Sequence, residues 1–330
     1  TLESSSAASD VYKRQVSASS VEGLNLYGDN FYFIKRHLTA IILGAIIFNI
    51  LKNLNINFIE KFSSISMVFI TTTLFLVLTY GIVVGGSRRW IDLGIVNFQP
   101  SELAKPLIIL WVAKQISNDI TEDTDLKKFV RSIFLPLLCA FLVLLEPDYG
   151  TFASICFILF SQIFFSKIKI IYPSLTIFAS ILPLYFVATS SEYRLSRIET
   201  WLSRKCDLGI DLLGDCFQLN QSRIAISSGG LFGLGPGTSR ARWGSLPNSY
   251  SDFISSIIGE EYGFFGLFLL VLAFFILIST TFLIAIREKN EIKKLISVGF
   301  GSWIFFQTVI NLGGAVGIVP ITGIVLPFVS

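Results

Sequence analysis

Charged side chains that could do chemistry are concentrated between residues 192 and 261. This stretch holds eight acidic and seven basic residues, and six of the basic ones are arginines. A guanidinium presents a planar fork of donors that suits phosphate oxygens, so several arginines together could hold a lipid-linked pyrophosphate. The alternative is that they pair with the neighbouring acids and with lipid headgroups. The basic residues are Arg194, Arg197, Arg204, Lys205, Arg223, Arg240 and Arg242.

A second pair of charges, Glu102 and Lys105, lies in the otherwise apolar segment 101–116. Residues three apart share one face of a helix, so the two side chains can form an ion pair. If the segment spans a membrane, such charges are costly unless they face a cavity or the bundle interior, which favours a functional role. The alternative is a structural pair that locks this helix against a neighbour. Pro100 and Ser101 predict the start of the helix, with Ser101 as its N-cap.

The elements that must position these residues are predicted to be membrane helices. The chain of 330 residues is 52% hydrophobic and only 15% charged, against roughly 25% charged in soluble domains. Its 31 Phe are spread over long uncharged runs and do not alternate with polar residues, which disfavours a β-barrel. The composition therefore predicts an all-α, polytopic transmembrane helical bundle. The net charge of +3 has scattered carriers and predicts no nucleic-acid partner.

Eight spans are predicted from the gaps between charged residues, because about 20 apolar residues cross the hydrocarbon core of a membrane. Five runs carry no charge and are near or above that length, whereas three others are shorter or contain charges. The uncharged runs are 62–87, 149–166, 170–191, 262–286 and 295–318, and the other three are 38–51, 101–116 and 132–145.

The distribution of Lys and Arg predicts the orientation of the chain, because short basic loops stay in the cytoplasm. With eight spans, the basic loops share the cytoplasmic face, and the long loop 192–261 lies outside with both chain ends. We expect a fragment that lacks its first and last helices, with residues 1–15 as a disordered or non-native tail. The basic loops are 52–61, 114–131, 167–169 and 287–294, and the other outer segments are 88–100 and 146–148.

Five long motifs follow one another along the chain. They are GGSRRWIDLGIVNFQPSELAK (85–105), EPDYGT (146–151), QSRIAISSGGLFGLGPGTS (221–239), LPNSYSDFISSIIGEEYG (246–263) and NLGGAVGIVPITGIVLPFVS (311–330). In order and spacing they resemble the SEDS family of cell-shape and division proteins, which includes FtsW, RodA and SpoVE. The resemblance is strongest to the FtsW group and covers about residues 16–330. It implies a single membrane domain of ten helices, of which eight are present, and a peptidoglycan glycosyltransferase that polymerises lipid II on the outer face.

The resemblance also suggests which carboxylate acts as the general base. Polymerisation requires a base for the acceptor hydroxyl and electrostatic help for the departing pyrophosphate. The family has a catalytic Asp in a pattern like D-P-x-G-x-G-Y-Q, and DLLGDCFQ matches it when counted back from Phe217, which selects Asp211. Counting forward from Trp201 selects Asp207, because the chain carries about four extra residues between these anchors. For Asp215 we expect a turn or a helix cap.

Several further residues are expected at the substrate on the same grounds. Arg194 and Arg197 match the family's basic pair ahead of the loop, and the family's Glu and Lys that shape the central cavity correspond to Glu102 and Lys105. The motif that begins at residue 221 adds three polar candidates for substrate or pyrophosphate binding. These are Gln221, Ser222 and Arg223. The glycines that follow, between 229 and 237, lack the ending of a nucleotide-binding loop and predict close packing or a flexible gate.

A divalent cation, Mg²⁺ or Mn²⁺, is a further expectation. Asp252, Glu260 and Glu261 resemble the family's SDF and GEE motifs and could coordinate such an ion together with the pyrophosphate. The alternative reading is that they favour the N-terminal turns of a helix. No organic cofactor is expected.

Two classes of function follow from these residues. The first is a lipid II polymerase of the bacterial cytoplasmic (inner) membrane that serves cell division and works with a class B penicillin-binding transpeptidase and other divisome proteins. The second is a lipid II flippase or transporter, in which Glu102 and Lys105 would be the main residues and the outer loop a gate. The carboxylates and arginines outside the bilayer favour the enzyme, because a transport pathway would place its charges nearer the midplane.

The four cysteines fall into two groups. Cys139 and Cys156 lie in apolar helices, where a free cysteine behaves as a small hydrophobe. Cys206 and Cys216 lie in the outer loop, ten positions apart, and bracket Asp207, Asp211 and Asp215. A disulfide between them would restrict the loop around Asp211, and the alternative is two unpaired cysteines in a reducing habitat.

Overall fold

The computed structural model describes most of the helical part of the chain. It covers residues 28–29, 31–53, 56–84, 87–92, 97–119, 126–189, 199, 201–203, 206–207, 214, 216–241, 245–247, 249 and 251–330. The predicted tail 1–15 lies outside these residues, as do Asp211, Asp215, Arg194 and Arg197.

The chain divides into two compact units, which we call the loop unit and the bundle unit. The loop unit comprises Thr1–Leu54, Leu195–Phe274 and Thr308–Ser330, and the bundle unit comprises Asn55–Arg194 and Phe275–Gln307. Two long helices, α11 (Ile254–Arg287) and α12 (Glu291–Val316), contribute residues to both units.

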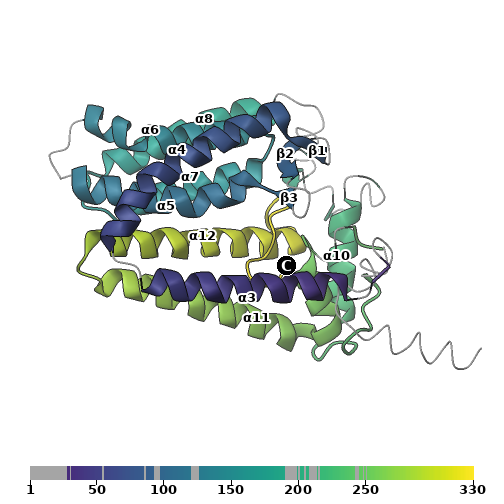
Figure 1. Cartoon of the computed structure of the whole chain (residues 1–330). Coiled ribbons are helices and arrows are strands. Elements are labelled where there is room, and N and C mark those ends of the chain that lie inside the picture. The colour runs from purple at the N-terminus through teal and green to yellow at the C-terminus, as the bar shows by residue number, and fades with distance from the viewer. Residues whose placement is uncertain are drawn as a thin grey trace, which may run out of the picture. The chain divides into compact units, whose positions relative to one another are not determined.

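The bundle unit is built from helices that lie side by side in Figure 1. Besides the parts of α11 and α12 nearest their connection, they are α4 (Ile56–Tyr80), α5 (Pro100–Asp119), α6 (Leu126–Leu145), α7 (Tyr149–Phe164) and α8 (Ile171–Thr189). Their apolar runs form a core that includes Met67, Ile108, Val112, Ile155 and Leu159, all at most 1% exposed. Because lipid tails are as apolar as these side chains, close packing between the helices stabilises this core more than removal from water does.

A small antiparallel sheet follows α4, where the sequence predicted a longer helix. The span 62–87 is too long, because α4 ends at Tyr80 and strand β1 (Ile82–Val84) begins two residues later. The β-branched residues of β1 favour a strand and pair with β2 (Ser87–Asp92), with Ile82 opposite Trp90. The short β3 (Asn97–Phe98) pairs with β2 and completes the order β1-β2-β3.

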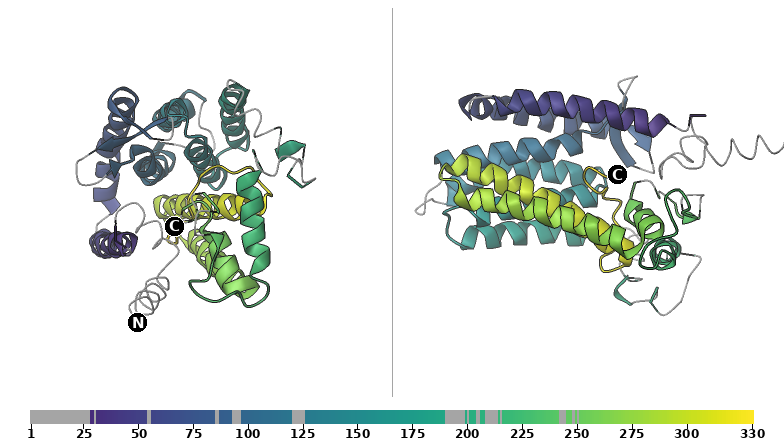
Figure 2. Two further views of the ribbon diagram at one scale, coloured as in Figure 1. Left: turned by 90° about the vertical axis from the view of Figure 1, so that its right-hand side faces the viewer. Right: turned by 90° about the horizontal axis from the view of Figure 1, so that it is seen from below.

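The loop unit contains α3 (Tyr32–Lys52), the short α10 (Phe217–Ser228), the start of α11 and the end of α12. Helix α10 runs across the start of α11, as Figures 1 and 2 show. A small cluster of buried apolar residues holds α10, the following loop, α11 and α12 together. It consists of Ala225, Ala241, Leu246, Phe253 and Ala315.

Helix α11 is interrupted at Gly263, whose φ of 66° and ψ of −159° lie outside the helical region. Four backbone groups that lose their helical partners there are paired with the glycine-rich loop after α10. Leu234 N and Gly235 N donate to the carbonyls of Glu260 and Glu261, and Phe264 N and Phe265 N donate to the carbonyls of Gly230 and Leu231. The loop therefore replaces part of one helical turn.

This pairing requires the backbones of the loop and α11 to approach closely. A Cβ at Gly229 would collide with the carbonyl of Gly259, and one at Gly263 would collide with the amide of Gly233. The close-packing interpretation of the glycine-rich segment is confirmed at these positions.

Every predicted span overlaps a helix, and the fold is that of an all-α, multi-pass membrane protein. Among the described residues, four helices are long and apolar enough to cross a membrane by length and composition: Lys61–Tyr80, Leu126–Leu145, Ile254–Arg287 and Glu291–Val316. Within the bundle unit, Lys167 pairs with Glu291 at 2.9 Å, which agrees with placing the loops 167–169 and 287–294 on one face.

Candidate functional site

The start of α5 positions the predicted ion pair. Helix α5 already includes Pro100 and Ser101, so the prediction that Ser101 is the N-cap is wrong. Proline suits the first helical position because its φ is fixed near the helical value and its missing N–H is not needed there. Glu102 lies in the first turn, as expected. Ser101 accepts a hydrogen bond from Gln99 at 3.1 Å.

Glu102 and Lys105 form the predicted i,i+3 ion pair, with 2.7 Å between Lys105 Nζ and Glu102 Oε1. The two partners differ in burial, because the side chain of Lys105 is 1% exposed and that of Glu102 is 43% exposed. The ammonium also lies 5.1 Å from the centroid of the Trp303 ring. The lysine is therefore held inside the bundle unit while the carboxylate remains accessible.

The turn between α6 and α7 connects three elements of the bundle unit. Arg89 on β2 donates to the backbone carbonyls of Glu146 and Pro147, at 3.2 and 2.5 Å. Asp148 caps α7 by accepting from Thr151 N at 3.1 Å and also accepts from Gln99 at 3.3 Å. The EPDYGT motif thus ties the β-hairpin and the start of α5 to α7.

Glu146 is the unusual member of this turn. It is 1% exposed, and neither carboxylate oxygen has a hydrogen-bond partner among the described residues. Burial, and to a lesser extent the nearby charge of Asp148, raises the pKa of Glu146 to about 8, while Arg89 opposes the shift. Neither Glu146 nor Arg89 was predicted as a site residue from the sequence. Charged residues at the ends of apolar helices were the only available signal.

In the loop unit, Cys206 and Cys216 form a disulfide with a Cα separation of 5.3 Å. The bridge, one of the two alternatives left by the sequence, is confirmed. Cys216 is fully buried and immediately precedes α10, so the bridge attaches the outer loop to that helix. Asp211 lies between the two cysteines in the sequence, outside the described residues.

Asp207, the second candidate for the base, is engaged by Arg223. The distance between Asp207 Oδ1 and Arg223 Nη1 is 2.7 Å, and Arg223 Nε donates to the carbonyl of Val316 at 3.0 Å. Arg223 therefore links the loop, α10 and the end of α12. These contacts give Asp207 and Arg223 a structural role. A catalytic or substrate-binding role for either residue would have to be compatible with it.

The other residues predicted on α10 differ in accessibility. Ser222 is fully buried, and its hydroxyl contacts Ser256 Oγ at 2.7 Å and donates to the carbonyl of Ala315 at 2.6 Å. These contacts join α10 to α11 and α12. Gln221 is half-buried on the neighbouring face of α10. Substrate binding by Gln221 and Ser222 stays a prediction.

The acidic residues proposed for a divalent cation do not form a metal site among the described residues. Both oxygens of the buried Glu260 carboxylate already accept hydrogen bonds, from Ser239 Oγ at 2.5 Å, Arg240 N at 3.0 Å and Ala241 N at 3.2 Å. Within the described part of the chain, no three potential ligands of the His, Cys, Asp or Glu type gather together. Since Asp211 and Asp215 lie outside it, the cation stays a prediction.

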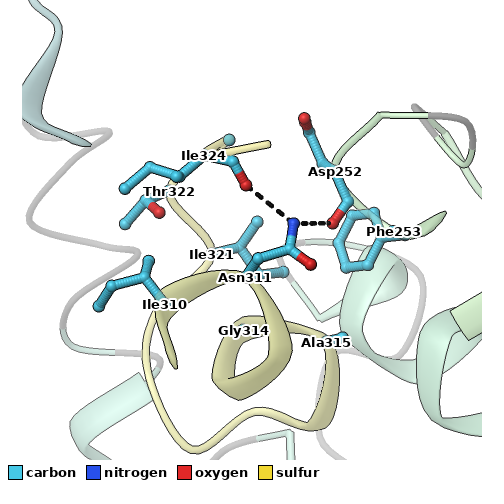
Figure 3. Close-up of a pocket in the computed structure, with 10 residues that line it drawn as sticks. Asp252, Phe253, Ile310, Asn311, Gly314, Ala315, Ile321, Thr322 and Ile324 are labelled. Atoms are coloured by element: carbon cyan, nitrogen blue, oxygen red, sulfur yellow. Dashed lines mark hydrogen bonds between the residues drawn. The ribbon is translucent and has the colours of Figure 1, made fainter. Parts of the chain in front are cut away.

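A small pocket in the loop unit involves Asp252, another of the three acidic candidates (Figure 3). It lies between the start of α11, the end of α12 and the segment 321–324. Asn311 Nδ2 donates to the carbonyls of Asp252 and Ile324, at 2.9 and 2.8 Å. The buried Oδ1 of the same side chain has no hydrogen-bond partner among the described residues. Burial raises the pKa of Asp252.

Comparison with known proteins identifies the family of this chain. A family model described as a cell cycle protein, covering FtsW, RodA and SpoVE, matches residues 15–330. The chain belongs to this family. The motifs that contain Glu102, Glu146, Asp252 and Asn311 all lie within the matched region, so the sites described above are sites of a SEDS family member.

Named relatives and solved structures agree with this assignment. The probable peptidoglycan glycosyltransferase FtsW of Buchnera aphidicola subsp. Schizaphis graminum is 34% identical over 321 residues, which cover 96% of this chain and 90% of that protein. Stage V sporulation protein E of Bacillus subtilis is 32% identical over 317 residues, covering 95% of this chain and 86% of that protein.

The structure is similar to that of the rod shape determining protein RodA of Thermus thermophilus, with 25% identity and a TM-score of 0.66. The match covers 95% of this chain and 85% of RodA. A chain from a structure titled "Structural coordination of polymerization and crosslinking by a peptidoglycan synthase complex" has 26% identity and a TM-score of 0.72, covering 90% of this chain and 82% of that one.

Proposed function

We propose that this SEDS protein is a peptidoglycan glycosyltransferase that polymerises lipid II into glycan strands at the outer face of the cytoplasmic membrane. The observation that carries the proposal is the match of almost the whole chain to relatives named as peptidoglycan glycosyltransferases. The protein is accordingly an enzyme of the glycosyltransferase class. The long loop between α8 and α10 is the part that carries the charges the reaction needs.

Asp211 is proposed as the general base that takes the proton from the acceptor hydroxyl. One contact favours it over Asp207. The Cys206–Cys216 bridge closes a short loop that contains both residues, but Arg223 already engages the Asp207 carboxylate at 2.7 Å. A general base must contact the acceptor hydroxyl, and the Asp207 carboxylate is already in contact with Arg223.

The departing pyrophosphate requires positive charge as it leaves the donor sugar. Arg194 and Arg197 are proposed to bind it, because a guanidinium can contact two phosphate oxygens at once. Lys105 and Glu102 are proposed to line the substrate cavity. A divalent cation would supply further electrostatic stabilisation of the pyrophosphate when bound.

The cellular setting is also a proposal. A relative in the structural comparison comes from a complex that coordinates polymerization and crosslinking. We propose a class B penicillin-binding transpeptidase as the corresponding partner of this chain, together with other proteins of the divisome. The FtsW names among the relatives favour a role in cell division in the inner membrane.

The proposed base is tested with two matched variants, Asp211→Asn and Asp207→Asn, purified in detergent and assayed for lipid II polymerisation. Asp211→Asn is expected to abolish polymerisation without changing the thermal unfolding of the protein, because it removes a base and little packing. Asp207→Asn is expected to be milder in activity. A silent Asp211 variant together with an inactive Asp207 variant would move the base to Asp207.

The second candidate function is a lipid II flippase. It is favoured by one observation, the burial of the Lys105 ammonium inside a helical bundle, since such a charge is often part of a transport path. A flippase moves lipid II between leaflets and makes no glycan product, so an assay in detergent separates the two functions.

A further inference from the structure

The contacts of Lys105 are made by residues from two helices of the bundle unit. Glu102 is its neighbour on α5, with Nζ and Oε1 2.7 Å apart, whereas Trp303 belongs to α12 and lies nearly two hundred positions away in the sequence. The ammonium is 5.1 Å from the centroid of the Trp303 ring, inside the range of a cation–π interaction. The lysine is thus held between a carboxylate and an aromatic ring.

The register of α5 and α12 is fixed one turn further along. The amide of Gln162 on α7 is fully buried and donates to the carbonyls of Ile109 on α5 and Leu295 on α12, at 3.0 and 3.1 Å. A Cβ at Gly299 would lie 2.6 Å from Ile109 Cγ2 and 3.0 Å from Gln162 Nε2, so only glycine permits this approach.

Ile109 and Lys105 are four residues apart on α5, and Gly299 and Trp303 are four residues apart on α12. Residues four apart share a helix face. The close contact at Gly299 therefore brings Trp303 directly to Lys105, and the position of the ring follows from the packing of three helices.

Burying an isolated ammonium group costs free energy, and fixing a flexible lysine side chain in one rotamer costs conformational entropy. Because Glu102 is 43% exposed, it is a weak constraint by itself. The ring of Trp303, whose place is set by the packing of α12 against α5, supplies a second partner. The ring carries no net charge, so it can hold the amine in place without adding a second negative charge beside it.

We infer that Trp303 is a positioning residue, which holds the Lys105 ammonium in place for the lipid-linked substrate. This inference rests on the proposed function, in which Lys105 lines the substrate cavity. Trp303 acts through Lys105, so its replacement should lower substrate turnover only while Lys105 is present.

The test compares Trp303→Leu and Trp303→Phe in the wild-type and Lys105→Met backgrounds, using lipid II polymerisation and thermal unfolding in detergent. Trp303→Leu should lower kcat/KM by roughly 5- to 30-fold, which corresponds to about 1–2 kcal/mol. Trp303→Phe keeps an aromatic face and should recover most of this loss. In the Lys105→Met background, Trp303→Leu should cause no further loss of the remaining activity.

Trp111 provides the matched control. It is a tryptophan of the same unit, on α5, whose indole N–H donates to the carbonyl of Ser132 at 3.2 Å. Trp111→Leu should lower the unfolding temperature and leave kcat/KM near the wild-type value. Equal losses of kcat/KM in the two Leu variants, or an unchanged loss in the Lys105→Met background, would reduce Trp303 to a packing residue and overturn the inference.

The thermal measurements keep this test separate from the proposed function. If Trp303 holds Lys105, the effects of Trp303→Leu and Lys105→Met on the free energy of unfolding will not add, whether or not the chain makes glycan. Additive effects would contradict the contact itself. Non-additive unfolding in a folded protein that makes no glycan would reject the polymerase proposal and the role in turnover, but retain the contact.

Discussion

At the scale of single residues, two equally buried glutamates differ in their hydrogen bonds. Glu146 and Glu260 are both almost fully buried, but Glu260 accepts three hydrogen bonds and Glu146 accepts none among the described residues. A carboxyl without donors prefers its neutral form in a low-dielectric site. This accounts for the rise of the pKa of Glu146 to about 8.

The raised pKa of Glu146 makes stability depend on pH in a definite direction. Between its ordinary pKa of 4.5 and about 8, the folded chain retains a proton that the unfolded chain has lost, so this residue lowers stability as pH rises through that window. Glu146→Gln keeps the shape and removes the titration. We expect the variant to be more stable than the wild type by up to a few kcal/mol at pH 8–9.

The comparison is made by thermal unfolding in detergent at pH 5 and pH 9. The advantage of Glu146→Gln should shrink toward pH 5, because the wild-type residue then approaches its protonated form in both states. An advantage of the same size at both values would mean that the Glu146 carboxyl does not titrate between them.

Residue spacing predicted some contacts and could not predict others. The Glu102–Lys105 pair follows from local helix geometry, so three positions of sequence were enough. Trp303 at Lys105 and Asn311 at Asp252 depend on how distant helices pack, and a single sequence contains no direct record of that packing. The same limit explains why the buried, unpaired state of Glu146 was not foreseen.

At the scale of elements, uncharged runs predicted where helices lie more reliably than where they end. The run 62–87 has no charge, yet α4 stops at Tyr80 because the following residues pair as strands. Absence of charge measures hydrophobicity, which helices and buried strands share. The interruption of α11 at Gly263 was also not predicted, because the backbone groups that pair with α11 there come from a separate loop.

The interruption of α11 provides a test at this scale. Gly263→Ala is expected to destabilise the protein by about 2–4 kcal/mol, because an L side chain is strained at φ 66° and its Cβ would collide with the loop backbone. Thermal unfolding in detergent measures the loss. Gly44→Ala is the matched control, since a Cβ there meets nothing within 4 Å, and it should be nearly neutral or stabilising.

Equal behaviour of the two alanine variants would show that the loop does not pair with α11 as described. The result is independent of any assay of activity, because it depends only on the backbone geometry at Gly263 and Gly44.

The disulfide offers a second test at the scale of elements. Cys206→Ser with Cys216→Ser should lower stability by about 2–3 kcal/mol, because the bridge restricts a short loop in the unfolded chain. A mild reductant should lower polymerisation by the wild type and leave the double variant unchanged. Equal sensitivity of the two proteins to the reductant would show that the bridge does not support the proposed base.

At the scale of the whole molecule, the sequence predicted the class of fold because composition alone requires it. A chain with 52% hydrophobic and 15% charged residues can satisfy its backbone in a membrane by forming helices. The division into a loop unit and a bundle unit was not predicted. It depends on the positions along α11 and α12 at which each helix passes from one unit to the other. Asp211, Arg194 and Arg197 lie outside the described residues, and their roles stay predictions.

The two units separate two kinds of candidate chemistry. The loop unit contains the disulfide, the Asp207–Arg223 pair and the pocket of Asn311, whereas the bundle unit contains Lys105 with its two partners. In our proposal a polymerase uses carboxylates of the outer loop for its reaction and Lys105 for the substrate, while a flippase would depend on Lys105 for transport. The two functions therefore predict different results once the membrane is removed.

The most direct test is to incubate the purified chain with labelled lipid II in detergent, alone and with its transpeptidase partner, and to separate the products by size. No leaflets exist in detergent, so transport contributes nothing to the signal. The polymerase account predicts a ladder of glycan strands that grows with time and is absent from an Asp211→Asn control. A folded protein that leaves lipid II unpolymerised under both conditions would contradict it.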